Sequence, residues 1–210
     1  MTEQAQREQL VALAKSMFER GYATGGAGNL SVRLGDEHLL ATPTGASFGR
    51  LDPARLSLLD MNGQHLSGDK PSKEVSFHLA IYQQRPSAKA IVHLHSTYLT
   101  ALSCLSELDR ANAIKAFTPY YVMRVGSLPV VEYFNPGDPR IGSELAKLAP
   151  DYRAYLLANH GPVVTGSDLL DAVDNAEELE ETAKLYLLLR GNQVAYLSDE
   201  NVAILASKGV

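Results

Sequence analysis

Two of the six histidines, His93 and His95, are separated by a single residue in an apolar segment, and a third, His160, follows another apolar segment. The run Ala90–His95 predicts a β-strand, so the imidazoles of His93 and His95 project from the same face. His160 comes directly after the apolar run Tyr155–Ala158, which predicts a buried strand. A metal ion shared by these rings offsets the desolvation that each would suffer alone. Three histidines with one open position are typical of a catalytic metal site, although two solvated histidines at a strand end remain the alternative for His93 and His95.

Glu74 is the candidate for a carboxylate that shares this site. The alternative is an acid in the first turn of a helix, stabilised there by the helix dipole. His78 lies four residues later on the same expected helix and is interpreted as structural. His38 and His65 lie near expected turns and are interpreted as solvated.

Small polar residues beside glycines, together with a helix start, predict an anion site. Ser72 and Lys73 fall where a helix is expected to begin, and free backbone N–H groups there favour a phosphate. The pairs Gly28-Asn29 and Thr44-Gly45 allow the backbone to approach a ligand closely. Ordinary turns and a serine cap are the alternative. The sequence contains neither a dinucleotide-binding fingerprint nor a Walker loop, which argues against a nucleotide cofactor.

Helices and strands that position these residues can be read from hydrophobic periodicity. Helices are expected around Leu10–Phe18 with Gly21 as the stop, from Pro71-Ser72 through Tyr82, around Ala101–Leu105, and from Ser167 to Arg190 with Gly191 as the stop. Further strands are expected at Leu39–Thr42, Leu56–Asp60 and Leu128–Val131, with a hairpin turn at Asn62-Gly63. This order predicts a single α/β domain over residues 1–210, with a partly antiparallel sheet covered by helices on both faces.

Two features of the expected helices receive structural interpretations. The acidic residues of the long helix are expected to form its solvated face: Glu177, Glu178, Glu180 and Glu181. Cys104 has no basic neighbour in the sequence and is expected to be a small core residue.

Composition narrows the functional class. The 210 residues include 45% apolar and 20% charged residues, as in an ordinary globular protein, and the net charge of −5 argues against nucleic acid as a partner. A single cysteine favours a reducing compartment. The N-terminal residues lack the features of a secretory signal, and no apolar run has the length of a membrane span, so a cytoplasmic location without membrane attachment is expected.

Taken together, five motifs resemble those of the class II aldolase/adducin family, in order and spacing, over essentially the whole chain. The motifs are Gly28-Asn29-Leu30-Ser31, Thr42-Pro43-Thr44-Gly45, Pro71-Ser72-Lys73-Glu74, His93-Leu94-His95-Ser96 and Asn159-His160-Gly161. The resemblance implies a three-layer α/β/α fold with a largely antiparallel or mixed sheet. It also implies a homotetramer with sites at subunit interfaces.

The resemblance further implies roles for individual residues. His93, His95 and His160 would hold a divalent metal, usually zinc, and Glu74 would be the acid/base. A substrate phosphate would be held by Asn29, Thr44, Gly45 and Ser72, while Lys73 stands where the sugar-phosphate aldolases have a second serine. In those aldolases a tyrosine from a neighbouring subunit protonates the leaving aldehyde. Tyr120 is the best match for it, with Tyr121 as the alternative.

Within the family, the stretches SGDKPSKE, VHLHSTY, TPYYVMRVG and ANHGPVV are most similar to the 3-oxo-tetronate 4-phosphate decarboxylases. The expected activity is therefore that of a metal-dependent carbon–carbon lyase, which converts a phosphorylated sugar acid to dihydroxyacetone phosphate and carbon dioxide. A sugar-phosphate aldolase or 4-epimerase is the first alternative. A non-catalytic scaffold like the adducin head domain is less well matched, because the three metal histidines would be expected to be lost there. Binding of a metabolite without turnover is the remaining alternative.

Overall fold

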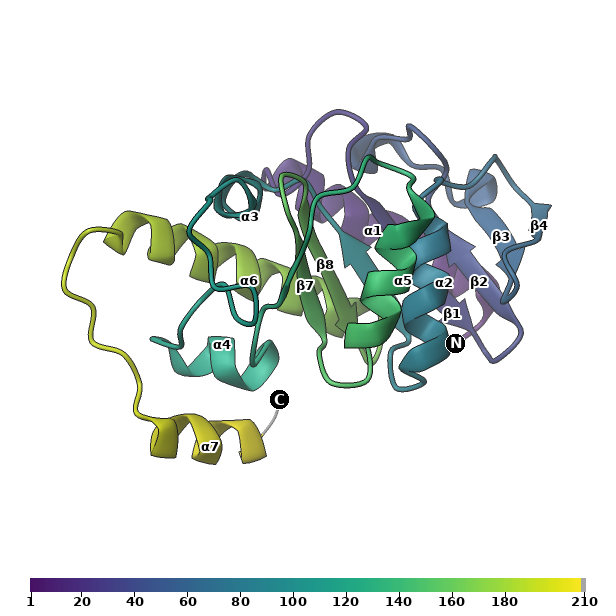
Figure 1. Ribbon diagram of the computed structural model, residues 1–210. Helices are drawn as coiled ribbons and strands as arrows, with labels where there is room; N and C mark the ends of the chain where they lie inside the picture. The colour runs from purple at the N-terminus through teal and green to yellow at the C-terminus, as the bar shows by residue number, and fades with distance from the viewer. Residues whose placement is uncertain (209–210) are drawn as a thin grey trace.

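A computed structural model describes residues 1–208, which form an eight-stranded sheet with helices against both faces (Figure 1). The order of the strands across the sheet is β4-β3-β2-β1-β5-β8-β7-β6. Neighbouring strands are antiparallel, except that β6 and β7 are parallel. The strands are β1 (Asn29–Leu34), β2 (His38–Ala41), β3 (Ser57–Asp60), β4 (His65–Ser67), β5 (Ala90–His93), β6 (Val130–Val131), β7 (Ala154–Leu157) and β8 (Gly161–Gly166).

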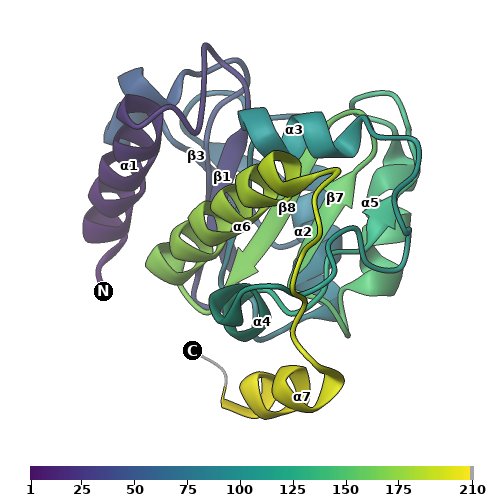
Figure 2. The same ribbon diagram turned by 90° about the vertical axis from the view of Figure 1, so that its left-hand side faces the viewer.

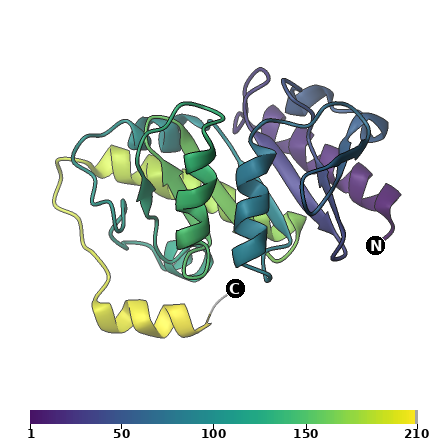
Figure 3. The ribbon, with the colours of Figure 1, turned by 45° about the vertical axis from the view of Figure 1, so that its right-hand side comes forward.

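The helices form the two outer layers. Helices α1 and α6 cover one face of the sheet (Figure 2), and α2 and α5 cover the other (Figure 3). The helices are α1 (Glu3–Glu19), α2 (Val75–Gln84), α3 (Thr97–Ser103), α4 (Pro119–Arg124), α5 (Pro139–Leu148), α6 (Leu169–Leu189) and α7 (Asp199–Lys208), with short 3-10 helices η1 (Phe48–Arg50) and η2 (Pro53–Arg55). The predicted three-layer α/β/α fold is confirmed.

Side chains of the central strand β5 alternate between the two layers. Ala90 and Val92 pack into the core on the α1 and α6 side, whereas Ile91 packs into the core on the α2 and α5 side. His93 has the same parity as Ile91, and its ring contacts that of Phe77 on α2 edge-on, with 5.5 Å between ring centroids. The strand that carries the first histidine therefore directs it towards α2.

The long helix α6 agrees closely with its predicted pattern. The predicted apolar stripe is buried throughout: Leu169, Ala172, Val173, Ala176, Leu179 and Ala183. Gly191, two residues beyond the helix, has a φ of +85°, a conformation that glycine adopts without strain. The hairpin turn at Asn62-Gly63 is also present, between β3 and β4.

Other expectations need correction. The predicted strand Ala90–His95 ends at His93, and the helix predicted from Pro71-Ser72 begins at Val75. That helix starts late because Pro71 pairs with Pro43 in an isolated antiparallel bridge, which keeps this segment extended. The helix expected to include Ala101–Leu105 is α3, which ends at Ser103.

Two side chains lie in surroundings opposite to those predicted. Cys104 is exposed because it follows the last residue of α3, where the chain leaves the core. Glu180 is buried, with 7% of its surface exposed, although the acidic run was expected to be solvated. Within residues 1–208, no helix is both long and apolar enough to cross a membrane.

Candidate metal centre

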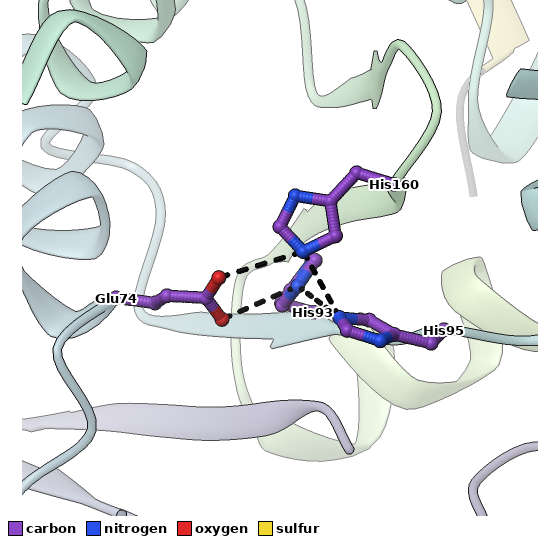
Figure 4. Close-up of side chains that lie close together, drawn as sticks. All are labelled: Glu74, His93, His95 and His160. Carbon is purple, nitrogen blue, oxygen red and sulfur yellow. Dashed lines mark hydrogen bonds and ion pairs between the residues drawn. The ribbon is translucent and has the colours of Figure 1, made fainter. Parts of the chain in front are cut away.

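Four potential metal ligands converge at one end of the central strands. One atom each from Glu74, His93, His95 and His160 lies within 4.8 Å of the others (Figure 4). The Nε2 atom of His95 is 3.1 Å from that of His93 and 3.0 Å from that of His160. The Glu74 carboxylate closes the group, with Oε2 at 3.4 Å from His93 Nε2 and Oε1 at 3.5 Å from His160 Nε2.

Antiparallel pairing brings the histidines together from distant parts of the sequence. In the sheet His93 pairs with Asn29 of β1 on one side and with Val163 of β8 on the other. His160 lies in the turn between β7 and β8, and this turn ends next to the chain that follows β5. A side chain at Gly161 would lie 2.3 Å from the carbonyl oxygen of Leu94, so only glycine permits this approach.

Gly28, on the β1 side of β5, also allows two stretches of backbone to approach closely, as Gly161 does on the β8 side. Gly28 has a φ of +85°, and a side chain there would lie 2.8 Å from the carbonyl oxygen of His93. The backbone can therefore enter β1 directly beside His93, which places Asn29 within the site.

Glu74 is held in the turn that precedes α2. Its backbone carbonyl accepts hydrogen bonds from the N–H groups of Phe77 and His78, at 3.1 and 3.4 Å, so the residue is tied to the first turn of the helix. The buried Asn29 donates a hydrogen bond of 2.7 Å from Nδ2 to Oε2 of Glu74. The carboxylate is thus oriented from the helix and from β1 together.

Burial favours the neutral form of the three imidazoles, most strongly at His93, which is fully buried, and less at His95, which is partly exposed. Desolvation, reinforced by the two neighbouring histidines, lowers the pKa of His93 well below its ordinary value. The pKa values of His95 and His160 are also lowered, again mainly by burial, while the Glu74 carboxylate opposes the shift in both. Neutral imidazole is the form that binds metals, because a lone pair is then available on the ring.

The tautomer of His93 favours a cation in the centre of the group. Nδ1 lies 2.8 Å from the carbonyl oxygen of Pro162. A carbonyl can only accept a hydrogen bond, so Nδ1 carries the proton of the neutral ring, and Nε2 is left with a lone pair. His95 Nε2 carries at most one proton, so it cannot form good hydrogen bonds with both neighbouring nitrogens. A cation resolves this conflict by accepting all the lone pairs.

The separations also suit a small divalent ion. Ligand atoms at tetrahedral corners about 2.0–2.1 Å from zinc lie about 3.3–3.4 Å apart. Four contacts that link the histidine nitrogens and the carboxylate oxygens span 3.0–3.5 Å. Imidazole and carboxylate donors are those that zinc and similar divalent metals take. The residues present therefore fit a divalent metal.

The residues predicted to bind phosphate lie on adjoining segments beside this cluster, Asn29 at the start of β1 and the others on loops. The backbone N–H of Thr44 donates to the carbonyl of Lys70 at 2.9 Å, and that of Ser72 donates to Thr42 at 3.4 Å. The glycine-rich loop reaches the same place, because a side chain at Gly26 would lie 2.7 Å from the carbonyl oxygen of Gly45. Asn29, Thr44, Gly45 and Ser72 therefore come from three segments that lie side by side.

Ser72 and Lys73 lie before the helix rather than within its first turn. The Ser72 hydroxyl accepts a hydrogen bond of 3.3 Å from the N–H of Glu74, and Lys73 is exposed. Thr44 and Gly45 line a surface pocket of about 330 Å³ that also includes Arg50, Arg55, Asp52 and Asp69, and Arg55 is paired with Asp69 at 2.7 Å.

Tyr120 lies away from the cluster of its own chain. It is 59% exposed on α4, and the end of α4 contacts the start of β7, where Arg153 donates to the carbonyl of Arg124. His160 follows the other end of β7, so the cluster lies at the end of that strand opposite to α4. Figure 1 shows the positions of α4 and β7. Tyr121 is fully buried, and its hydroxyl shares its one proton between two acceptors of the same chain, Asn112 Oδ1 and the carbonyl of Ile114.

Glu180 is a residue of the site region whose role the sequence did not indicate. Its carboxylate accepts hydrogen bonds from the Ser96 hydroxyl and from the backbone N–H groups of Tyr98 and Leu99. These groups belong to the start of α3, directly after His95. Glu180 follows Val173 and Ala176 at helical spacing, which places it beside the apolar stripe of α6. This spacing could have predicted that Glu180 is buried.

The cluster at the end of the mixed sheet, with one carboxylate and three imidazoles, is a site suited to a divalent metal. Residues 8–187 match the family described as Class II Aldolase and Adducin N-terminal domain, and the chain belongs to this family.

Individual relatives cover the whole chain. The chain is 62% identical over 209 residues to the 3-oxo-tetronate 4-phosphate decarboxylase of Haemophilus influenzae, and the match covers 100% of both proteins. The crystal structure of YgbL from Klebsiella pneumoniae superposes with a TM-score of 0.96 at 60% identity, over 98% of this chain and 99% of that one. A solved L-fuculose 1-phosphate aldolase has a TM-score of 0.87 at 32% identity, over 97% and 95% of the two chains.

Proposed function

We propose that this protein decarboxylates 3-oxo-tetronate 4-phosphate to dihydroxyacetone phosphate and carbon dioxide. The observation that carries the proposal is the 62% identity, over both full lengths, to a protein of that name. The Glu74–histidine cluster supplies the groups that such a reaction requires. The similarity to the aldolase is lower, at 32% identity, which favours decarboxylation over aldol cleavage.

The proposed cofactor is a zinc ion held by Nε2 of His93, His95 and His160. A bound divalent metal would supply Lewis-acid stabilisation of the negative charge that develops on substrate oxygen as carbon dioxide leaves. The Pro162 carbonyl supports this role because it fixes the tautomer of His93 that presents a lone pair to the ion.

Glu74 is the proposed proton donor. When the bond between C2 and the carboxylate breaks, its electron pair remains with the substrate, and a proton must be added at C2. Protonated Glu74 delivers that proton and then regains one from water, so each turnover consumes one proton and releases one carbon dioxide. Asn29 limits rotation of the carboxylate through its 2.7 Å hydrogen bond to Oε2.

The substrate phosphate is assigned to the adjoining segments beside the cluster. The hydroxyls of Thr44 and Ser72 and the second Nδ2 proton of Asn29 can donate to phosphate oxygens. The absence of a side chain at Gly45 allows the backbone to approach, and Lys73 adds a positive charge nearby.

A homotetramer with sites at subunit interfaces is the proposed assembly. The exposed position of Tyr120, at the opposite end of β7 from His160, supports it, because this tyrosine cannot serve its own chain's cluster without a large rearrangement. The phenol would enter a neighbouring site and donate a hydrogen bond to the departing part of the substrate.

Product analysis tests the proposed reaction. Zinc-loaded protein is incubated with 3-oxo-tetronate 4-phosphate, and carbon dioxide and dihydroxyacetone phosphate are measured, with a reaction that lacks protein as the control. Equimolar release of both products is expected. Release of a free aldehyde from ketose phosphates, without carbon dioxide from the oxo acid, would assign an aldolase instead.

A further inference from the structure

A row of polar side chains joins α2 to β1 and continues from Glu74 along the helix. Glu74, His78 and Tyr82 follow one another at intervals of four residues, so they lie along one side of α2 and its preceding turn. Asn29 and Ser31 alternate on β1 and share the face that meets them. Asn29 bonds Glu74, and Ser31 Oγ lies 2.7 Å from Nδ1 of His78 and 2.9 Å from the hydroxyl of Tyr82.

The hydrogen atoms in this row can be assigned by following the donors. The Tyr82 hydroxyl donates to the backbone carbonyl of Ser31 at 3.1 Å, so it accepts the proton of the Ser31 hydroxyl. The Ser31 oxygen must then accept from His78, which places a proton on Nδ1. His78 is consequently the donor that begins a chain of three hydrogen bonds, which runs through the Ser31 and Tyr82 hydroxyls and ends at the Ser31 carbonyl.

His78 carries a cost that an apolar residue would avoid. The side chain is fully buried, and its Nε2 atom has no hydrogen-bond partner within residues 1–208. Burial, with a smaller contribution from His93, also lowers the pKa of His78 well below its ordinary value, so the ring is neutral. A buried acceptor without a partner destabilises a fold, which indicates that the position is occupied for another reason.

We propose that His78 is a positioning residue that fixes α2 over β1 and thereby holds the Glu74 carboxylate beside His93. The inference rests on the proposed function, in which Glu74 transfers the proton. The connection is mechanical: Glu74 is bonded through its carbonyl to the first turn of α2, and His78 anchors that turn to Ser31. A shift of the helix would move the carboxylate from its 3.4 Å contact with His93.

The test compares His78→Phe with His78→Asn. Phenylalanine keeps a planar ring but lacks the donor, and Ser31 keeps Tyr82 as a partner. We expect unchanged metal content, a KM within about twofold of the wild type and a kcat reduced about tenfold, since small displacements of a catalytic group are costly. The melting temperature should not fall, because the unpartnered Nε2 is removed. Asparagine can place an amide nitrogen near the position of Nδ1 and should restore most of the lost kcat.

Tyr155→Phe is the matched control. It also removes one hydrogen-bond donor from a buried residue, here the hydroxyl that donates to the Tyr152 carbonyl at 2.7 Å, but Tyr155 lies outside this row. Its kcat should equal that of the wild type. A lower melting temperature with normal kcat in His78→Phe would reduce His78 to a stabilising residue and overturn the proposal, as would an equal loss of kcat in His78→Asn.

A crystal structure of His78→Phe separates this inference from the proposed reaction. Displacement of the Glu74 carboxylate from His93 supports the positioning role even if the wild-type protein proves to catalyse a different reaction. An unchanged distance between Glu74 Oε2 and His93 Nε2 overturns the positioning role whatever the reaction is.

Discussion

Glu180 accepts a hydrogen bond of 2.6 Å from the hydroxyl of Ser96, the residue that directly follows His95. The same carboxylate accepts the backbone N–H groups of Tyr98 and Leu99, at 2.8 and 2.9 Å. These N–H groups belong to the first turn of α3 and have no acceptor within the helix. A residue of α6 therefore anchors the segment that carries His95, which lies beyond the end of β5.

Glu180→Ala should weaken metal binding, because the anchor next to His95 is lost. We expect a dissociation constant for zinc about tenfold higher, within the range found for residues that orient metal ligands. Buried N–H groups without acceptors should also lower stability by about 1–3 kcal/mol each. Competition with a chromogenic chelator measures the affinity. Glu181→Ala, which alters an exposed residue one position along α6, is the control, and equal zinc affinity in the two variants would disprove the anchoring role.

His160→Ala should lose both bound metal and activity, because too few donors remain in the cluster. His65→Ala is the control: its ring is exposed and lies near the Ser67 carbonyl, outside the cluster. Elemental analysis after dialysis measures the metal content, which should be about one ion per chain in the control. Full occupancy in a triple variant of His93, His95 and His160 would refute the assignment of the site.

Glu74→Gln should keep the fold and the metal while turnover falls by a factor on the order of 10² to 10⁴, the usual contribution of a general acid or base. Glutamine preserves the shape of the side chain, and its amide oxygen can still accept the hydrogen bond from Asn29. The loss of turnover therefore measures the contribution of proton transfer by Glu74. Steady-state rates at saturating substrate provide the measurement. Turnover close to that of the wild type would leave Glu74 as a structural acid at the start of α2.

Ser72→Asp should raise the KM for a phosphorylated substrate by about 10²-fold, because a fixed negative charge within about 4 Å of the phosphate costs a few kcal/mol in partly buried surroundings. Aspartate can still accept the N–H of Glu74, as the serine hydroxyl does, so the melting temperature and metal content should remain normal. Ser72→Ala removes only the hydroxyl and should have a much smaller effect. An unchanged KM in Ser72→Asp would place the phosphate elsewhere.

Apolar periodicity in the sequence predicted many of the helices and strands, and residue types and spacing indicated which side chains could share a metal site. The stripe on α6 and the strands β5 and β7 follow directly from apolar periodicity, and the resemblance of the motifs implied the three-layer arrangement. Convergence of His160 with His93 depends on the pairing of β5 with β8, a contact between distant segments that periodicity does not encode.

Deviations from the predicted structure have long-range causes. The bridge between Pro43 and Pro71 delays the start of α2, although proline and serine are typical of a helix start. Glu180 is buried because α3 needs an acceptor at its first turn, a requirement that arises only once the two helices pack together. His78 could not be distinguished from a mundane helical histidine until Ser31 was placed opposite it.

The separation of α4 from the metal cluster along β7 has a genetic consequence. If the proposed tetramer forms and catalysis needs both Glu74 and Tyr120, each working site must draw them from different polypeptides. Two alleles that are each inactive, one altered at Glu74 and the other at Tyr120, would then complement each other when expressed in the same cell. Some sites of the mixed assemblies would combine an intact glutamate with an intact tyrosine, while other sites would lack both.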